Sequence, residues 1–290
     1  MELYQINQVS GNLRRMPSNM KVQIVIMSDW SFPGPGKGFS LHNHSVFSDG
    51  ASMLEEMVSA AKNAGLAVFG MSDHWVDLPY DGTDYLTWSM PHDKLPEYVE
   101  TLLKLREQYE DENFKLKIGL EVDFFFENAE KVVKYLREYP LDYLIGSVHY
   151  AGVFSVDYDI SDWIGLSEKE IGDICSIYWQ KVAGAADCGY FDFIGHLDLP
   201  KKFGMIDNSK YFQNAVDVLD IIQKRSGAIE VNTAGWFKQC NEPYPSLPIL
   251  KEACKRNIPV AVNADAHCSE HVNRHFQQGY ALLKEAGYSF

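Results

Sequence analysis

The chain has 290 residues, 46% of them hydrophobic, with 26 basic residues against 40 acidic ones and a net charge of −14. That charge disfavours broad contact with nucleic acid or an anionic membrane. It does not argue against a small anionic substrate held by metal ions, because bound ions can reverse the local field. The length suits a single α/β barrel domain.

Cysteine usage and the N-terminal composition indicate the compartment. Five cysteines are scattered without a C-x-x-C pair, which predicts reduced thiols (Cys175, Cys188, Cys240, Cys254 and Cys268). The first 20 residues are polar and lack an apolar signal core. We therefore expect a cytoplasmic protein.

Residues 1–37 are predicted to be an N-terminal extension to a catalytic domain at 38–290. Within the extension, 22–27 has the composition of a strand but is far too short to span a bilayer. Prolines and glycines at 32–36 separate it from the rest.

From residue 38 onward, short apolar runs alternate with stretches of helical spacing. The predicted strands are 38–41, 66–71, 116–120, 143–147, 191–194, 228–231 and 258–262. The predicted helices are 52–63, 94–110, 129–138, 168–186, 209–225, 247–256 and 271–286. Such alternation predicts parallel strands with right-handed crossovers. Seven repeats without a linker favour a closed or nearly closed α/β barrel, and an open doubly wound sheet is the alternative.

Two long connections are rich in aromatic residues. One, 73–93, carries Trp75, Tyr80, Tyr85 and Trp88, and the other, 150–166, carries Phe154, Tyr158 and Trp163. Loops of this kind form either the walls of a substrate pocket or packed surface, and the sequence favours neither.

Every predicted strand ends in a polar residue, and most of these are of metal-ligand type. Catalytic groups of α/β barrels gather at the C-terminal ends of the strands, so these residues are expected to converge. Six of the nine histidines lie there, with Asp49, Glu121 and Asp265 as carboxylate partners (His42, His44, His74, His149, His196 and His267).

Nine candidate ligands exceed the needs of one ion, since a zinc ion uses about four. They predict two or three divalent metals, with Glu121 as a bridging carboxylate. Imidazole and carboxylate ligands suit Zn, Fe or Mn. Clustered metals suit hydrolysis of phosphoesters by a metal-activated hydroxide. The sequence has no G-x-S-x-G elbow, P-loop or G-x-G-x-x-G motif, although amidohydrolase chemistry would use similar ligands.

The strand-end motifs resemble those of the PHP superfamily, named for polymerase and histidinol phosphatase. The resemblance runs from residue 42 to about residue 276 and rests on several short motifs (His42-x-His44, Ser72-Asp73-His74, Gly119-Leu120-Glu121, Gly146-Ser147-Val148-His149, Gly195-His196 and Asp265-Ala266-His267). Segments 195–203 and 230–235 look most like the histidinol-phosphatase branch. The resemblance implies a distorted seven-stranded (β/α)7 barrel with a trinuclear metal centre that hydrolyses a phosphomonoester.

The resemblance also implies how the ligands divide among the metals. The first metal would take His42, His44, Glu121 and Asp265, and the second would share Glu121 with His149 and His196. The third would take His74 and His267. Many relatives place a further histidine after the first motif, where this chain has Asp49. Either Asp49 replaces that imidazole or the third site binds weakly.

Residues near the strand ends are candidates for substrate contact. Lys201, Lys202 and Arg274 are expected to hold phosphoryl oxygens, with at least one of the two lysines a surface charge instead. Asp198 would orient a ligand or protonate the leaving alkoxide, and Asn232 would contact substrate or hold a neighbouring ligand. Glu230 is expected to face away from Asn232. His271 and His275 are expected on an exposed helix face.

The sequence thus predicts a metal-dependent phosphomonoesterase with histidinol phosphate as the expected substrate. Alternatives are a related phosphoesterase that acts on another small phosphate or a nucleotide, and a non-catalytic module that binds metal. A nuclease is disfavoured by the charge of −14, and no oligomeric state is predicted.

Overall fold

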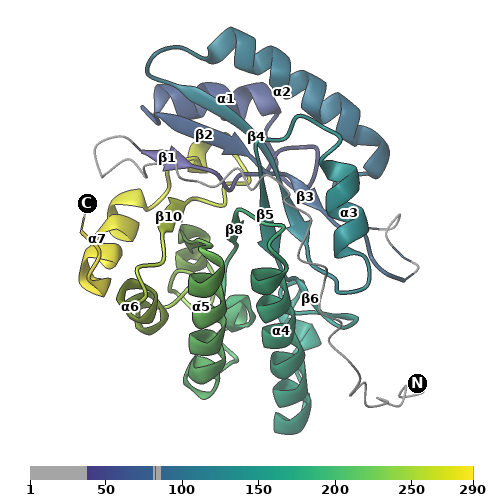
Figure 1. Cartoon of the computed structure of the whole chain (residues 1–290), viewed down its shortest axis with the longest axis vertical. Coiled ribbons are helices and arrows are strands. Elements are labelled where there is room, and N and C mark those ends of the chain that lie inside the picture. The colour runs from purple at the N-terminus through teal and green to yellow at the C-terminus, as the bar shows by residue number, and fades with distance from the viewer. Residues whose placement is uncertain (1–37, 81, 83–85, 290) are drawn as a thin grey trace. The chain divides into compact units, whose positions relative to one another are not determined.

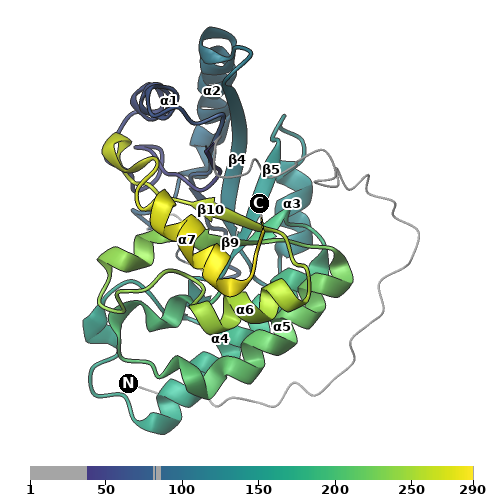
Figure 2. The ribbon, with the colours of Figure 1, turned by 90° about the vertical axis from the view of Figure 1, so that its left-hand side faces the viewer.

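The computed structural model describes residues 38–80, 82 and 86–289, which form an α/β fold (Figures 1 and 2). Seven strands form a sheet in the order β1 (Phe39–Ser40), β2 (Val68–Met71), β4 (Lys115–Asp123), β5 (Tyr143–Ser147), β8 (Phe193–Ile194), β9 (Ile229–Asn232) and β10 (Val260–Asn263). All of these pairs are parallel. The two-residue β3 (His74–Trp75) also pairs with β4.

Helices follow the strands and surround the sheet (Figures 1 and 2). They are α1 (Leu54–Asn63), α2 (Leu95–Tyr109), α3 (Ala129–Leu136), α4 (Glu168–Cys188), α5 (Phe212–Arg225), α6 (Leu247–Lys255) and α7 (Phe276–Ala286). Short 3-10 turns are η3 (His92–Lys94), η4 (Ile160–Asp162), η5 (Leu199–Phe203), η6 (Asn208–Tyr211), η7 (Thr233–Phe237) and η8 (Ser269–His271). No described helix is both long and apolar enough to cross a bilayer.

The two edge strands of the sheet, β1 and β10, meet and nearly close it into a barrel. Asn43 and Ala266 form a parallel bridge, and the His44 amide donates to the Ala266 carbonyl at 2.8 Å. The Leu41 amide donates to Asn263 Oδ1 at 2.9 Å. The predicted (β/α)7 barrel is therefore confirmed, and the open sheet is wrong.

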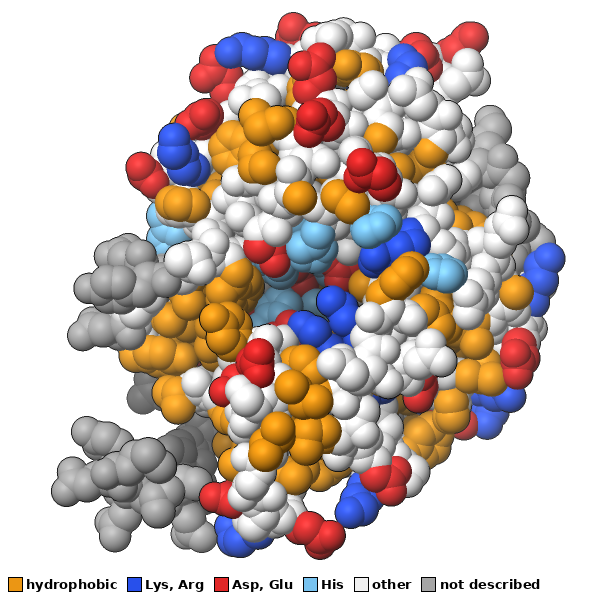
Figure 3. All heavy atoms as spheres, turned by 180° about the vertical axis from the view of Figure 1, so that it is seen from behind, with side chains coloured by type: hydrophobic (Ala, Val, Ile, Leu, Met, Phe, Trp, Pro, Cys, Tyr) orange, Lys and Arg blue, Asp and Glu red, His pale blue; other side chains and the backbone are white. Residues whose placement is uncertain are grey.

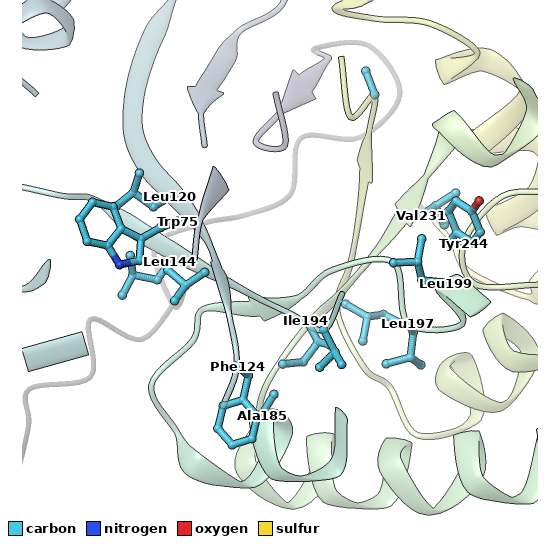
Figure 4. Close-up of a cluster of buried hydrophobic side chains, with 14 of the residues drawn as sticks. Trp75, Leu120, Phe124, Leu144, Ala185, Ile194, Leu197, Leu199, Val231 and Tyr244 are labelled. Carbon is cyan, nitrogen blue, oxygen red and sulfur yellow. The ribbon is translucent and has the colours of Figure 1, made fainter. Parts of the chain in front are cut away.

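The apolar core lies between the sheet and its helices. Figure 4 shows it as buried side chains from several strands and loops, among them Leu120 of β4 and Leu144 of β5. Side chains alternate along a strand, so Glu121, next to Leu120, points into the barrel. The alternation thus buries an apolar outer face and leaves the inner face for polar groups.

Every predicted strand and helix is present, with ends shifted by a few residues. The main error is the last helix, which begins at Phe276 and not at 271, because η8 precedes it and His275 has φ 58. The hairpin β6 (Tyr150–Ala151) and β7 (Phe154–Ser155) was not predicted, since two-residue strands carry no periodicity. The strand at 22–27 and the extension 1–37 lie outside the described residues, so the domain boundary at 38 stays a prediction.

Tyr143 of β5 ties three strands together inside the barrel. Its hydroxyl donates to the Leu41 carbonyl at 2.5 Å and to the Met71 carbonyl at 3.2 Å. Glycines make room for its ring, because a Cβ on Gly119 would lie 2.4 Å from Tyr143 Cζ, and one on Gly70 would lie 2.3 Å from its hydroxyl oxygen.

We predict that Gly119→Ala lowers the free energy of unfolding by about 1–3 kcal/mol, because the added methyl group overpacks the barrel against Tyr143. Urea denaturation measures the change. Gly172→Ala in α4 is the matched control, since its Cβ meets nothing within 4 Å. It should stabilise the protein by roughly 0.5–1 kcal/mol, as Ala does for Gly in a helix. Equal effects of the two variants would contradict this account.

Candidate metal centre

Six of the nine predicted metal ligands line one cavity of about 480 Å³ (Asp49, His74, His149, His196, Asp265 and His267). Figure 3 shows this hollow, with histidines and carboxylates at its bottom and basic side chains beside them. Nine predicted metal ligands fall into four groups whose donor atoms lie within 4.8 Å of one another (His44, Asp49, His74 and His267; His42, His44 and Asp265; His42, Glu121 and His196; His74, Glu121 and His149).

Glu121 stands at the centre of these groups, and its side chain is fully buried. Its Oε1 lies 2.7 Å from His196 Nε2 and 3.6 Å from His149 Nε2. Its Oε2 lies 3.2 Å from His42 Nε2 and 3.6 Å from His44 Nε2. Oε2 also lies 2.7 Å from His74 Nδ1. The two oxygens therefore face different sets of histidines, as the oxygens of a bridging carboxylate do.

Asp265 completes the donor set around His42 and His44. Its Oδ1 lies 3.1 Å from His44 Nε2 and 3.7 Å from His42 Nε2. Donor atoms around a tetrahedral ion at about 2.1 Å lie about 3.4 Å apart, so these distances suit a single ion. Asn232 is fully buried and donates from Nδ2 to Asp265 Oδ2 at 2.8 Å, which favours its role in holding a ligand over substrate contact.

Asp49 lies at the mouth of the cavity with His74 and His267. Its carboxylate is 3.6 Å from His74 Nε2 and 3.3 Å from His267 Nε2. Buried Asp73 shapes the loop that carries it, because Asp73 Oδ1 accepts the Ser45 amide at 2.8 Å and the Ser48 amide at 3.1 Å. The loop thus presents the Asp49 carboxylate to His74 and His267.

The donor atoms are placed to bind metal ions and not to form hydrogen bonds with one another. Several are buried and make no hydrogen bond of correct geometry with any described residue (His42 Nε2, His44 Nε2, His74 Nδ1, Glu121 Oε2 and Asp265 Oδ1). Buried polar atoms without partners are costly, and a cation among them removes that cost. A mixed set of imidazole nitrogens and carboxylate oxygens suits zinc, iron or manganese.

Two carboxylates that the sequence analysis did not assign lie beside the Nδ1 atoms of metal-donor histidines. Asp123 accepts the His149 Nδ1 proton at 2.9 Å. Glu230, fully buried, lies 3.1 Å from His42 Nδ1. The expectation that Glu230 faces away from Asn232 is wrong, because residues two apart in a strand share a face. The alternation of side chains along a strand could therefore have predicted that Glu230 points toward the metal donors.

Basic side chains line one wall of the cavity. They are Lys202, Arg274 and Lys238, and Lys238 was not singled out in the sequence. Lys202 Nζ pairs with Asp157 Oδ2 at 3.0 Å, whereas the Lys238 ammonium makes no hydrogen bond or ion pair with a described residue. The Arg274 guanidinium lies over the Phe237 ring at 4.3 Å.

Comparison with known proteins agrees with this geometry. The family model described as "PHP domain" matches residues 40–234, about two thirds of the chain. The chain belongs to the PHP family. A "Probable histidinol-phosphatase" of Deinococcus radiodurans is 34% identical over 238 residues, which are 80% of this chain and 86% of the relative. The "Histidinol-phosphatase" of Lactococcus lactis is 24% identical, with 87% and 92% covered.

Solved structures share the fold of this PHP chain. The histidinol phosphate phosphatase of Lactococcus lactis, in complex with zinc, L-histidinol and phosphate, superposes with a TM-score of 0.74 at 20% identity, and covers 87% of this chain and 95% of that one. A putative histidinol phosphatase of Listeria monocytogenes gives 0.72 at 22% identity, with 83% and 99% covered.

The other predicted substrate residues of the PHP chain lie away from the cavity wall. Lys201 is buried, with Nζ 2.7 Å from the Pro243 carbonyl and 3.0 Å from Asp198 Oδ2, and it lines a second cavity. Asp198 Oδ2 also accepts the Ser246 amide at 3.0 Å, and burial raises the pKa of Asp198. These contacts favour a role for both residues in holding the loop after β8.

His271 and the aromatic loops also differ from expectation. His271 lies in η8 and not on a helix face, and it lines the metal-donor cavity, so that expectation is wrong. In the first loop, Trp75 is buried, and Trp88 packs edge-on against His74 and His149, with ring centroids 4.9 Å and 5.4 Å away. None of the described aromatic side chains of the two loops lines the cavity, and Tyr158 is exposed.

Charges in the centre set the protonation of its histidines. Burial, with repulsion from His74 and His267, lowers the pKa of His44 to about 3. Burial also acts to lower the pKa of His149, but Asp123 and Glu121 outweigh it and raise the value to about 10. Without metal, His149 would therefore carry a proton at neutral pH, and metal binding would release it.

Proposed function

We propose that this PHP domain is a metal-dependent phosphomonoesterase whose substrate is histidinol phosphate. The observation that carries the proposal is Glu121, whose two buried oxygens face two separate sets of histidines. All four of the curated relatives are named histidinol-phosphatase or probable histidinol-phosphatase. One of the solved relatives holds zinc, L-histidinol and phosphate.

The donors divide into three proposed metal positions. We assign His42, His44 and Asp265, one of the four donor groups, to the first position together with Glu121. We assign His149 and His196, which both lie beside Glu121 Oε1, to the second position together with Glu121. His74, His267 and Asp49 form the third, with Asp49 supplying the carboxylate. Zinc, iron and manganese all suit this donor set.

When bound, divalent ions at these positions would lower the pKa of water and neutralise charge on the phosphoryl oxygens. Glu121 would hold two of the positions at a fixed separation. Asn232 keeps the Asp265 carboxylate aimed at the first position through its 2.8 Å hydrogen bond. Asp123 fixes the His149 ring so that its Nε2 points inward.

The cavity wall complements the charges of the ester. Lys202, Lys238 and Arg274 would bind phosphoryl oxygens, and partial burial and repulsion from Lys202 lower the pKa of Lys238, as expected for clustered cations awaiting an anion. Asp157 is the carboxylate of this wall outside the metal-donor groups. We propose that the Asp157 carboxylate binds the ammonium group of the histidinol part of the substrate.

The first prediction is that metal-loaded protein releases inorganic phosphate from histidinol phosphate. Glu121→Gln should lose more than about 100-fold in kcat/KM and also lose bound metal, because it removes a shared ligand. Phosphate release and elemental analysis measure the two effects. Glu100→Gln, an exposed change on α2, is the control. Full metal content and rate in Glu121→Gln would overturn the proposal. Metal binding without turnover of any phosphoester would favour a non-catalytic module.

The second prediction concerns phosphate capture. Lys202→Met and Lys238→Met should each weaken inhibition by inorganic phosphate about tenfold or more, because each removes a charge-assisted hydrogen bond. Lys201→Met is the matched control, since its ammonium is bonded to the Pro243 carbonyl and Asp198. It should lower thermal stability and leave the phosphate inhibition constant unchanged. A loss of phosphate affinity confined to Lys201→Met would reverse the assignment.

A further inference from the structure

We propose that Glu230 is a positioning residue that supports both of the metal positions on either side of Glu121. The inference rests on the proposed metal centre and goes beyond it, because Glu230 supplies no donor atom to the cavity. It acts through hydrogen bonds to a residue of each position.

Glu230 reaches His42 of the first position and His196 of the second. Both of its oxygens lie 3.1 Å from His42 Nδ1, while His42 Nε2 points the other way, toward Glu121. Its Oε1 also accepts the backbone amide of His196 at 2.8 Å, and the His196 ring lies 2.7 Å from Glu121 Oε1. One carboxylate thus fixes a ring of one position and the main chain of the other.

The same carboxylate braces the closure of the barrel. Asn263 Nδ2 donates to Glu230 Oε2 at 2.8 Å, and Asn263 Oδ1 accepts the Leu41 amide at the end of β1. Glu230 on β9 therefore links the ends of β1, β8 and β10. Between β8 and β9 the register contains a single residue pair, Ile194 with Ile229, and the bond from the His196 amide to Glu230 extends this short contact.

Asp123 is a natural comparison, because it supports one position only. Both of its hydrogen bonds go to His149, from Nδ1 at 2.9 Å and from the amide at 3.1 Å. Removing its charge should weaken the second position and spare the first. Removing the charge of Glu230 should weaken both.

The substitution Glu230→Gln keeps the shape of the side chain and changes its bonding. An ionised carboxylate accepts only, and Glu230 accepts from four groups (His42 Nδ1, His196 N, Asn232 Nδ2 and Asn263 Nδ2). In glutamine, an NH2 group would replace one of the two carboxylate oxygens. Its N–H groups would face N–H groups of these partners, and at least one hydrogen bond would be lost. Outer partners of metal-ligating histidines change metal affinity by about 10–100-fold when they are removed.

The test is competition of the full-length protein with a chromophoric chelator for Zn²⁺, with elemental analysis of the loaded protein. Glu230→Gln should lower the affinity of two equivalents about 10–100-fold. The equivalent at His74, Asp49 and His267 should be unchanged. Asp123→Asn should weaken one equivalent. Circular dichroism of the metal-free variants checks that each remains folded.

Two results would overturn the inference while leaving the metal centre standing. One is unchanged zinc affinity in Glu230→Gln, and the other is a loss of a single equivalent, as in Asp123→Asn. If Glu230→Gln does not fold, Glu230→Asp takes its place: its shorter side chain keeps the charge but cannot span His42 and His196, so it should weaken the same two equivalents. Failure of the unmodified protein to bind zinc would overturn both this inference and the proposed function.

Discussion

The burial of the Glu121 carboxylate among histidines is the constraint on which the rest of this structure depends. A carboxylate taken out of water is costly unless charges and hydrogen bonds compensate it. Here it sits at most 3.6 Å from nitrogens of five histidines (His42, His44, His74, His149 and His196). Those histidines come from four strand ends, so the barrel must close for all five to reach the carboxylate.

The seam of the barrel shows how stability and site geometry are joined. The strands that close it are short, and side-chain hydrogen bonds add to the main-chain bridge where β1 meets β10. Glu230 bonds to His42 and accepts a hydrogen bond from Asn263, which in turn accepts one from the Leu41 amide at the seam. A change there would therefore reach the metal positions and the fold together. By contrast, the Tyr143 hydroxyl braces the barrel through the main-chain carbonyls of Leu41 and Met71.

The wall that faces the donors is arranged for an ester with two charges. Three cations lie on it, and Asp157, which pairs with Lys202, keeps a lowered pKa because Lys202 and His149 outweigh the effect of its burial. An anionic phosphate beside a cationic ammonium would match this arrangement. The charges of this wall would therefore favour a small molecule that carries both a phosphate and an ammonium group.

The strand order and the nine donors could be predicted from the sequence because each depends on a local signal. Apolar runs mark the strands, and a polar residue at the end of each run must lie at one rim of a parallel barrel. Which of Lys201 and Lys202 faces the cavity could not be predicted, because η5 turns successive side chains to different sides. Lys238 carries no periodic signal after η7, and only the folded chain brings it beside Arg274.

The most direct measurement is anomalous X-ray diffraction from crystals of the zinc-loaded protein, recorded on both sides of the zinc absorption edge. The account predicts strong peaks on the two sides of the Glu121 carboxylate, one toward His42 and His44 and one toward His149 and His196. A third peak is expected between His74, His267 and Asp49. Crystals of zinc-loaded protein with no anomalous peak within bonding distance of Glu121 would contradict it.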